Sequence, residues 1–204
     1  MRTGIATLIL LALGTWATWA ITEGFAVVTA EQARRLDIAR KQPAVPGVRL
    51  VDQVGRDFLL DAWVKQNNSL LVVEFIYTSC QSLCLALGTE FQQLQRSIVA
   101  QGLQDRVHLL SVSFDPAHDS PAVMRKYAER MQAQPATWTL ATVRDARELP
   151  TLLRTFGVTV IPDQLGGFQH NAALVWVAPA GRLVRVTDLD ANGLRYLLDE
   201  LASS

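Results

Sequence analysis

The sequence predicts an α/β fold built around a mixed central sheet. Residues 70–77 (LLVVEFIY) form a nearly continuous apolar run, which is typical of a strand covered on both faces. Residues 85–101 then repeat apolar side chains at helical spacing, and strand and helix patterns go on alternating along the chain. A hairpin expected at 172–186 adds antiparallel strands, so the sheet should be mixed.

Turn and capping signals predict the other elements in chain order. The short runs VRLV (48–51) and DFLL (57–60) flank a turn that contains Gly55, so they predict a β-hairpin. Ser120 followed by Pro121 marks the start of a helix. The expected elements after 70–77 and 85–101 are a strand at 107–114, helices at 121–131 and 145–156, strands at 172–177 and 183–186 around Pro179-Ala180-Gly181, and a closing helix at 192–201.

Composition excludes several classes of protein. The 204 residues are 50% hydrophobic and 19% charged, so the chain can bury a sizeable core and is not intrinsically disordered. Its 19 basic and 19 acidic residues balance, so no net charge favours nucleic acid, and we expect no nucleic-acid partner. Two cysteines are too few for a disulfide scaffold or a four-thiolate zinc site, so any function they have is that of one pair.

The N-terminal segment is apolar. Residues 3–22 contain no charged side chain, and at about 1.5 Å per residue a helix of this length spans roughly 30 Å, the thickness of a bilayer core. We therefore expect residues 1–22 to be a transmembrane helix, either an anchor or an uncleaved signal. A cleaved signal peptide is the alternative, with Ala20 or residues 28–30 as cleavage sites.

Whether this segment is a retained helix or a cleaved signal, the rest of the chain is expected to be exported. The expected location is the periplasmic side of a bacterial inner membrane, or the equivalent side of an organelle membrane. Residues 23–45, which include a charged stretch followed by prolines, are interpreted as a juxtamembrane connector. The folded domain is then expected over residues 46–204.

The cysteine pair lies where α/β sheets bind ligands. Cys80 and Cys84 come after the strongest strand and before a helix, and the i,i+4 spacing can place both sulfurs on one helix face. Residues 75–89 contain no charged side chain, and sulfur ligands in an apolar setting favour Cu(I). A structural disulfide and a pair of inert buried thiols are the alternatives. Export to an oxidising compartment favours a functional pair over both.

Three histidines could complete a metal site. His108 lies inside an apolar strand and is interpreted as structural, whereas His118 lies in a polar turn and is interpreted as a solvated loop residue. His170 follows a loop that contains Gly166 and Gly167 and precedes a strand, so the chain can bend to bring it against the cysteine loop. His170 is therefore the favoured third ligand, with His118 as the alternative.

The chain contains three motifs in order: FIYTSC-x-x-x-C (75–84), VSFDP followed by DSP (112–121), and His170 before an apolar strand with the later turn PAGRL (179–183). These motifs are similar to those of the SCO/SenC family of thioredoxin-like copper proteins, which assist cytochrome c oxidase assembly. They occur in the family's order and cover residues 46–202. The sequence departs from the family where proline commonly follows each cysteine, because Gln81 and Leu85 stand there, and Asn171 replaces the usual Ser or Thr.

The resemblance implies a fold, a metal and a role. It implies a thioredoxin-like fold in which Cys80, Cys84 and His170 bind copper, as Cu(I) or Cu(II), with Asp115 as an accessory residue near the site. The leading functional hypothesis is a membrane-anchored copper chaperone, without catalytic turnover, that delivers copper to a copper-acceptor subunit of cytochrome c oxidase.

Two other functions remain open from the sequence. The first is a thiol–disulfide oxidoreductase that reduces the cysteines of the acceptor site through Cys80 and Cys84. The second and weaker is a peroxiredoxin-like peroxidase. The segment before Cys80 lacks the proline and the cation that such a peroxidase needs.

Overall fold

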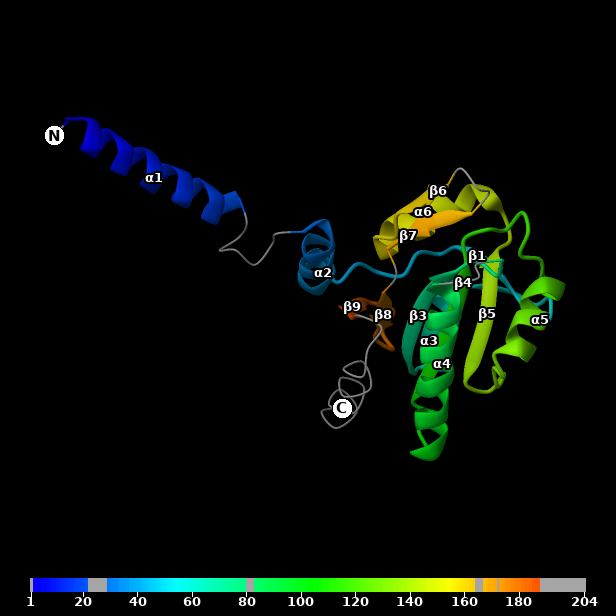
Figure 1. Cartoon of the computed structure of the whole chain (residues 1–204). Helices are drawn as coiled ribbons and strands as arrows, with labels where there is room; N and C mark the ends of the chain where they lie inside the picture. The colour runs from blue at the N-terminus through cyan, green and yellow to red at the C-terminus, as the bar shows by residue number, and fades with distance from the viewer. Residues whose placement is uncertain (1, 22–28, 80–82, 164–166, 172, 188–204) are drawn as a thin grey trace. The chain divides into compact units, whose positions relative to one another are not determined.

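The computed structural model describes residues 2–21, 29–79, 83–163, 167–171 and 173–187 (Figure 1). The chain divides into two compact units, residues 1–37 and 38–204. The first unit contains α1 (Arg2–Ile21) and most of α2 (Ala30–Lys41), whose first turn carries an ion pair between Glu31 and Arg34 at 2.6 Å. The expected transmembrane helix is not supported, because no helix in the described part of the chain combines the length and apolar character needed to cross a membrane.

The second unit is built on a mixed seven-stranded sheet, as the sequence predicts. Its strand order is β2-β1-β5-β4-β3-β8-β9, with β3, β4 and β5 parallel to one another and the remaining pairs antiparallel. The strands are β1 (Arg49–Asp52), β2 (Asp57–Leu59), β3 (Leu70–Ile76), β4 (Val107–Ser113), β5 (Trp138–Val143), β8 (Leu174–Val177) and β9 (Leu183–Thr187). A separate two-stranded sheet pairs β6 (Val160–Pro162) with β7 (Phe168–His170).

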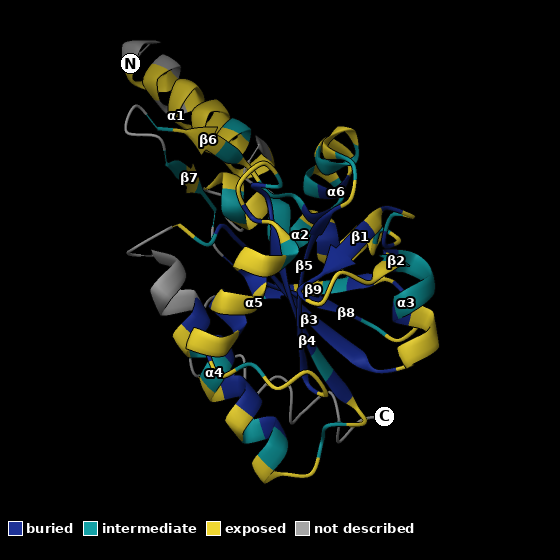
Figure 2. Ribbon diagram, turned by 90° about the vertical axis from the view of Figure 1, so that its right-hand side faces the viewer, coloured by how far each residue is buried: buried dark blue, intermediate teal, exposed yellow. Residues whose placement is uncertain are grey.

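Helices cover both faces of the large sheet, so its central strands are buried (Figure 2). One core cluster combines a face of β3 and β4 with α3 (Leu60–Asn67) and α6 (Leu149–Phe156), and the other combines the opposite face with α4 (Leu83–Ala100) and α5 (Pro121–Arg130). All seven residues of β3 are buried, which explains the unbroken apolar run by which the sequence predicts this strand.

The structure corrects several boundaries. The run 57–60 does not stay extended, because helix α3 begins at Leu60, and β5 was not anticipated. The helix expected at 145–156 is divided into the short 3-10 helix η1 (Ala146–Glu148) and α6. Asp145 caps η1 by accepting a hydrogen bond from the backbone N–H of Arg147. The closing helix expected at 192–201 lies outside the described residues.

One acidic side chain lies inside the core. Glu74 is fully buried in the middle of β3, on the face that packs against α4 and α5. The Ser111 hydroxyl donates to Glu74 Oε1, while the Trp138 ring nitrogen donates to the same hydroxyl at 2.8 Å. Oε2 has no hydrogen-bond partner among the described residues. Burial raises the pKa of Glu74 to about 8, so its carboxyl group is protonated at neutral pH.

The start of α5 is capped as the sequence predicts. Ser120 Oγ accepts from the backbone N–H of Val123 at 3.4 Å, and Pro121 occupies the first turn. Ser120→Ala should lower the free energy of unfolding by about 1 kcal/mol, since an orphan N–H loses its partner. Denaturant unfolding measures the change, with Ser97→Ala in the last turn of α4, away from any helix N-terminus, as the control. Equal losses in the two variants would contradict the assigned cap.

Candidate metal centre

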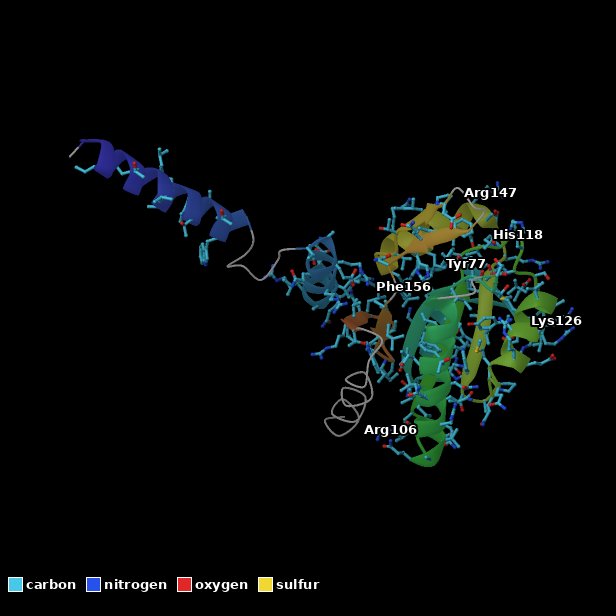
Figure 3. All side chains as sticks on the ribbon, viewed as in Figure 1. Tyr77, Arg106, His118, Lys126, Arg147 and Phe156 are labelled. Atoms are coloured by element: carbon cyan, nitrogen blue, oxygen red, sulfur yellow. The ribbon has the colours of Figure 1, made fainter. Side chains whose placement is uncertain are left out.

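The candidate site lies at the carboxyl ends of β3 and β4. The two strands are parallel, with Ile76 opposite Ser113, and the backbone N–H of Phe114 donates to the Ile76 carbonyl at 3.0 Å. Tyr77 and Phe114 therefore leave the sheet together, and Figure 3 shows Tyr77 at this end of β3. α/β proteins bind ligands at this end of the sheet, where the carboxyl ends of the parallel strands lie.

The cysteine loop connects this edge to α4. Cys80 lies outside the described residues, and Cys84 is the second residue of α4. Helix α4 starts at Leu83, inside the motif and two residues before the start that the sequence predicts. The position of Cys84 in the first turn places its backbone at a helix N-terminus, which carries partial positive charge and favours thiolate over thiol.

Asp119 holds the beginning of the cysteine loop. Its carboxylate accepts from the backbone N–H of Thr78 at 3.0 Å and from the Thr78 hydroxyl at 2.5 Å. It also accepts from the Ser113 hydroxyl at 2.5 Å, and the residue is only 1% exposed. Asp119 belongs to the DSP motif, but an acidic residue before Ser-Pro is also ordinary at a helix start, so the motif does not indicate its contact with Thr78.

Asp115, the expected accessory residue, is buried beside this network. Its backbone N–H donates to Ser113 Oγ at 3.1 Å. Its side chain pairs with His118, whose Nδ1 lies 2.9 Å from both carboxylate oxygens. This hydrogen bond to Asp115 raises the pKa of His118, whose side chain is 78% exposed (Figure 3). The structure thus places His118 on the surface, as the sequence predicts for a solvated loop residue.

His170 lies against the residues that leave β3 and β4. It is the last residue of β7, and its ring lies 5.0 Å from that of Phe114 at 62° between the planes. Tyr77 holds β7 in place, because its hydroxyl bridges the N–H and the carbonyl of Phe168 at 3.4 Å each. Figure 1 shows the β6–β7 hairpin beyond the end of the sheet that carries these residues. The contacts bring His170 to the sheet edge from which the cysteine loop departs.

The imidazole of His170 is suited to act as a metal ligand. Both ring nitrogens are shielded from solvent, and neither has a hydrogen-bond partner among the described residues. Burial lowers the pKa of His170, and the nearby backbone of Asn171 opposes this only in part. The imidazole is therefore neutral at neutral pH, which is the form that binds metals. An unpartnered buried imidazole is unusual in a folded protein, and a ligand would satisfy it.

His108 is separate from this constellation, as the sequence predicts. Its Nε2 lies 2.9 Å from the Thr139 hydroxyl, and its ring meets that of Trp63 edge-on at 5.2 Å. Burial lowers its pKa to about 4, so it is a neutral structural histidine.

Among the residues that the structure describes, no three or more His, Cys, Asp or Glu side chains gather closely enough to hold a metal.

Comparisons with known proteins agree with this architecture. The SCO1/SenC family matches residues 41–201. The SCO1 protein homolog of Bacillus subtilis (strain 168) is 25% identical over 125 residues, which are 60% of this chain and 62% of that protein. The chain therefore aligns with less than two thirds of the length of this relative.

Two solved structures share the fold. BsSco, described with a disulfide switch as a member of the Sco family of cytochrome c oxidase assembly proteins, superposes with a TM-score of 0.66 and 21% identity, covering 78% of this chain and 92% of that one. Copper-bound yeast Sco1 gives a TM-score of 0.64 and 20% identity, covering 79% and 91%. The thioredoxin-like α/β fold is thus confirmed. Because the family match spans most of the chain, from before β1 to beyond β9, this protein belongs to the SCO1/SenC family.

Proposed function

We propose that this chain is a copper carrier that delivers its metal to a copper-acceptor subunit of cytochrome c oxidase. Cys80, Cys84 and His170 hold the copper, as Cu(I) or Cu(II). The observation that carries the proposal is the half-buried His170 imidazole, whose two ring nitrogens are shielded and have no hydrogen-bond partner among the described residues. It lies at the end of the sheet that leads into the cysteine loop. Yeast Sco1 has been solved with copper bound, and BsSco belongs to a family of oxidase assembly proteins, which supports this role.

The chemistry of the three donors suits monovalent copper. Two thiolates and a neutral imidazole around Cu(I) carry a net charge of minus one, which an apolar setting tolerates better than an unneutralised dithiolate. The Phe114 ring packs against the imidazole, and the rings of Tyr77 and Phe168 pack against Phe114 in turn. Such an aromatic setting excludes water and harder cations. Copper is the cargo and leaves by ligand exchange with the acceptor, so no catalytic turnover is needed.

Asp115 has an accessory role in this proposal. It follows Phe114, which contacts His170, and its backbone N–H donates to Ser113 Oγ. Its buried carboxylate pairs with the exposed side chain of His118. The domain works on the exported side of a membrane, because the apolar segment 3–22 has the composition of an export signal.

The proposal is tested by Cu(I) competition titrations of the reduced protein against a chelator of known affinity. His170→Ala should weaken Cu(I) binding by at least about tenfold, since it removes one of three ligands. His118→Ala is the matched control. It likewise replaces a histidine by alanine, but His118 lies in the β4–α5 turn and is not one of the proposed ligands. Equal affinities of wild type and His170→Ala would refute this ligand assignment.

A second function is favoured by the disulfide switch described for BsSco. In this alternative, Cys80 or Cys84 attacks a disulfide of the acceptor protein, and the other cysteine resolves the mixed disulfide, so the acceptor is reduced while this chain is oxidised. A single-cysteine variant should then accumulate a mixed disulfide with the acceptor. If exchange proceeds equally well in His170→Ala while copper transfer is lost, the two functions are separable and use different parts of the site.

A further inference from the structure

We propose that Asp119 is a positioning residue for copper binding, because it fixes the start of the cysteine loop through Thr78. The inference rests on the proposed copper site and adds a residue that touches no metal. Asp119 lies in the turn between β4 and α5, about forty residues along the chain from the loop that it holds. Its role is to keep Cys80 within reach of Cys84 and His170.

Both oxygens of the Asp119 carboxylate accept hydrogen bonds. Oδ1 accepts from the Thr78 hydroxyl, and Oδ2 accepts from both the Thr78 N–H and the Ser113 hydroxyl. The side chain is almost completely buried, so water does not compete for these bonds. Hydrogen bonds to a charged acceptor are stronger than neutral ones, and losing a buried acceptor leaves its donors unpaired. The cluster therefore holds Thr78 in one position relative to β4.

Asp119 is itself held rigidly. Its backbone N–H donates to the Asp115 carbonyl at 2.9 Å, and the next residue, Ser120, caps α5. Ser113 is the last residue of β4 and lies opposite Ile76 in the sheet. The clamp therefore joins Thr78 to the end of a central strand and to the start of a helix. Neither support belongs to the cysteine loop.

The clamp lies close to both cysteines along the chain. Thr78 precedes Cys80 by two residues, a distance of at most about 7 Å along an extended chain. At the other end, α4 begins at Leu83, so residues 79–82 alone separate the clamp from the helix. This segment (SCQS) contains no proline to restrict its backbone. In our proposal the Asp119 carboxylate fixes Thr78 before the metal binds. A site that is ordered before binding holds its metal more tightly.

Asp119→Asn tests the clamp with little change in side-chain volume. The amide retains one acceptor oxygen and places an NH2 donor against groups that are already donors. We expect the reduced variant to bind Cu(I) at least about tenfold more weakly than wild type under conditions where both are fully folded. Thr78→Val removes only the hydroxyl and should give a smaller loss. If Asp119 acts through Thr78, the double variant should bind no more weakly than Asp119→Asn alone.

Val107→Ala separates positioning from general loss of stability. Val107 is fully buried at the start of β4, at the opposite end of the strand from Ser113. This variant should lower the denaturant concentration at the midpoint of unfolding but leave the Cu(I) affinity of the folded protein unchanged. An equal loss of Cu(I) affinity in Val107→Ala and Asp119→Asn would overturn the positioning role.

A second measurement does not depend on copper. The equilibrium between the Cys80–Cys84 dithiol and its disulfide, set against a glutathione buffer, reports how well the two thiols are held together. Asp119→Asn should shift this equilibrium by several-fold toward the dithiol. If wild type fails to bind Cu(I) but the thiol equilibrium shifts as expected, the copper function fails while the clamp stands. If neither copper affinity nor thiol equilibrium changes in Asp119→Asn, the clamp is wrong.

Discussion

Glu74→Gln is expected to stabilise the protein at pH 8 far more than at pH 5. The folded state keeps Glu74 protonated up to a pKa of about 8, whereas the unfolded chain ionises near 4.5. Between these values the folded state binds the extra proton, so this carboxyl group lowers the free energy of unfolding by about 1.4 kcal/mol for each unit of rising pH. Glutamine cannot ionise and removes this dependence, while its oxygen still accepts from Ser111.

The measurement is the difference in the free energy of unfolding between Glu74→Gln and wild type, across this pH interval. The difference should grow by roughly 3 to 4 kcal/mol from pH 5 to pH 8. Glu129→Gln is the control, since it removes an exposed carboxylate on α5 that is in water in both states. A difference that is the same at both pH values would show that Glu74 does not hold a proton in the folded protein.

Phe114→Ala is expected to affect stability and copper binding together. Phe114 is 4% exposed, and its ring contacts those of Tyr77, Phe168 and His170 at centroid distances of 5.4, 5.5 and 5.0 Å. Truncation should lower the free energy of unfolding by about 3 to 5 kcal/mol, since it leaves a cavity in the core. It also removes the ring that packs against the imidazole, so the Cu(I) affinity should fall at least about tenfold.

Two further variants make this result interpretable. Phe91→Ala deletes a fully buried ring on the other face of the sheet, where Phe91 packs 5.4 Å from Trp138. It should cost similar stability without weakening Cu(I) binding by the folded protein. Phe114→Leu keeps most of the buried volume and should fold, yet still bind Cu(I) less tightly. Unchanged Cu(I) affinity in Phe114→Leu would contradict a role for the ring in placing His170.

The sequence predicts those elements of the fold whose patterns are long and unbroken. The continuous apolar run of β3 and the periodic stripe of α4 are examples, and both are confirmed. The sequence does not predict strand β5, because its six residues (WTLATV) neither alternate apolar and polar side chains nor form an unbroken apolar run. In the structure Thr139 and Thr142 are buried and hydrogen-bonded to His108 and to the Ser113 carbonyl. The three-residue strands β6 and β7 are too short to give a pattern.

The candidate site was predictable only in part, for a related reason. His170 was favoured because a glycine-containing loop precedes it, and the structure brings it to the end of β4 against Phe114. The network around Asp119 depends on contacts between residues about forty positions apart, which no local pattern reveals. Glu74 likewise gave no signal, since its six neighbours in β3 are apolar and nothing in the sequence distinguishes a buried neutral acid from an ionised one.

X-ray absorption at the copper edge tests the proposed ligand set most directly. For the reduced, Cu(I)-loaded protein, the expected coordination is two sulfur atoms and one imidazole nitrogen for each copper. In His170→Ala the nitrogen contribution should disappear while both sulfurs remain, and in His118→Ala the spectrum should match that of wild type. An imidazole signal that persists in His170→Ala, or a wild-type spectrum without two sulfur ligands, would contradict a copper site formed by Cys80, Cys84 and His170.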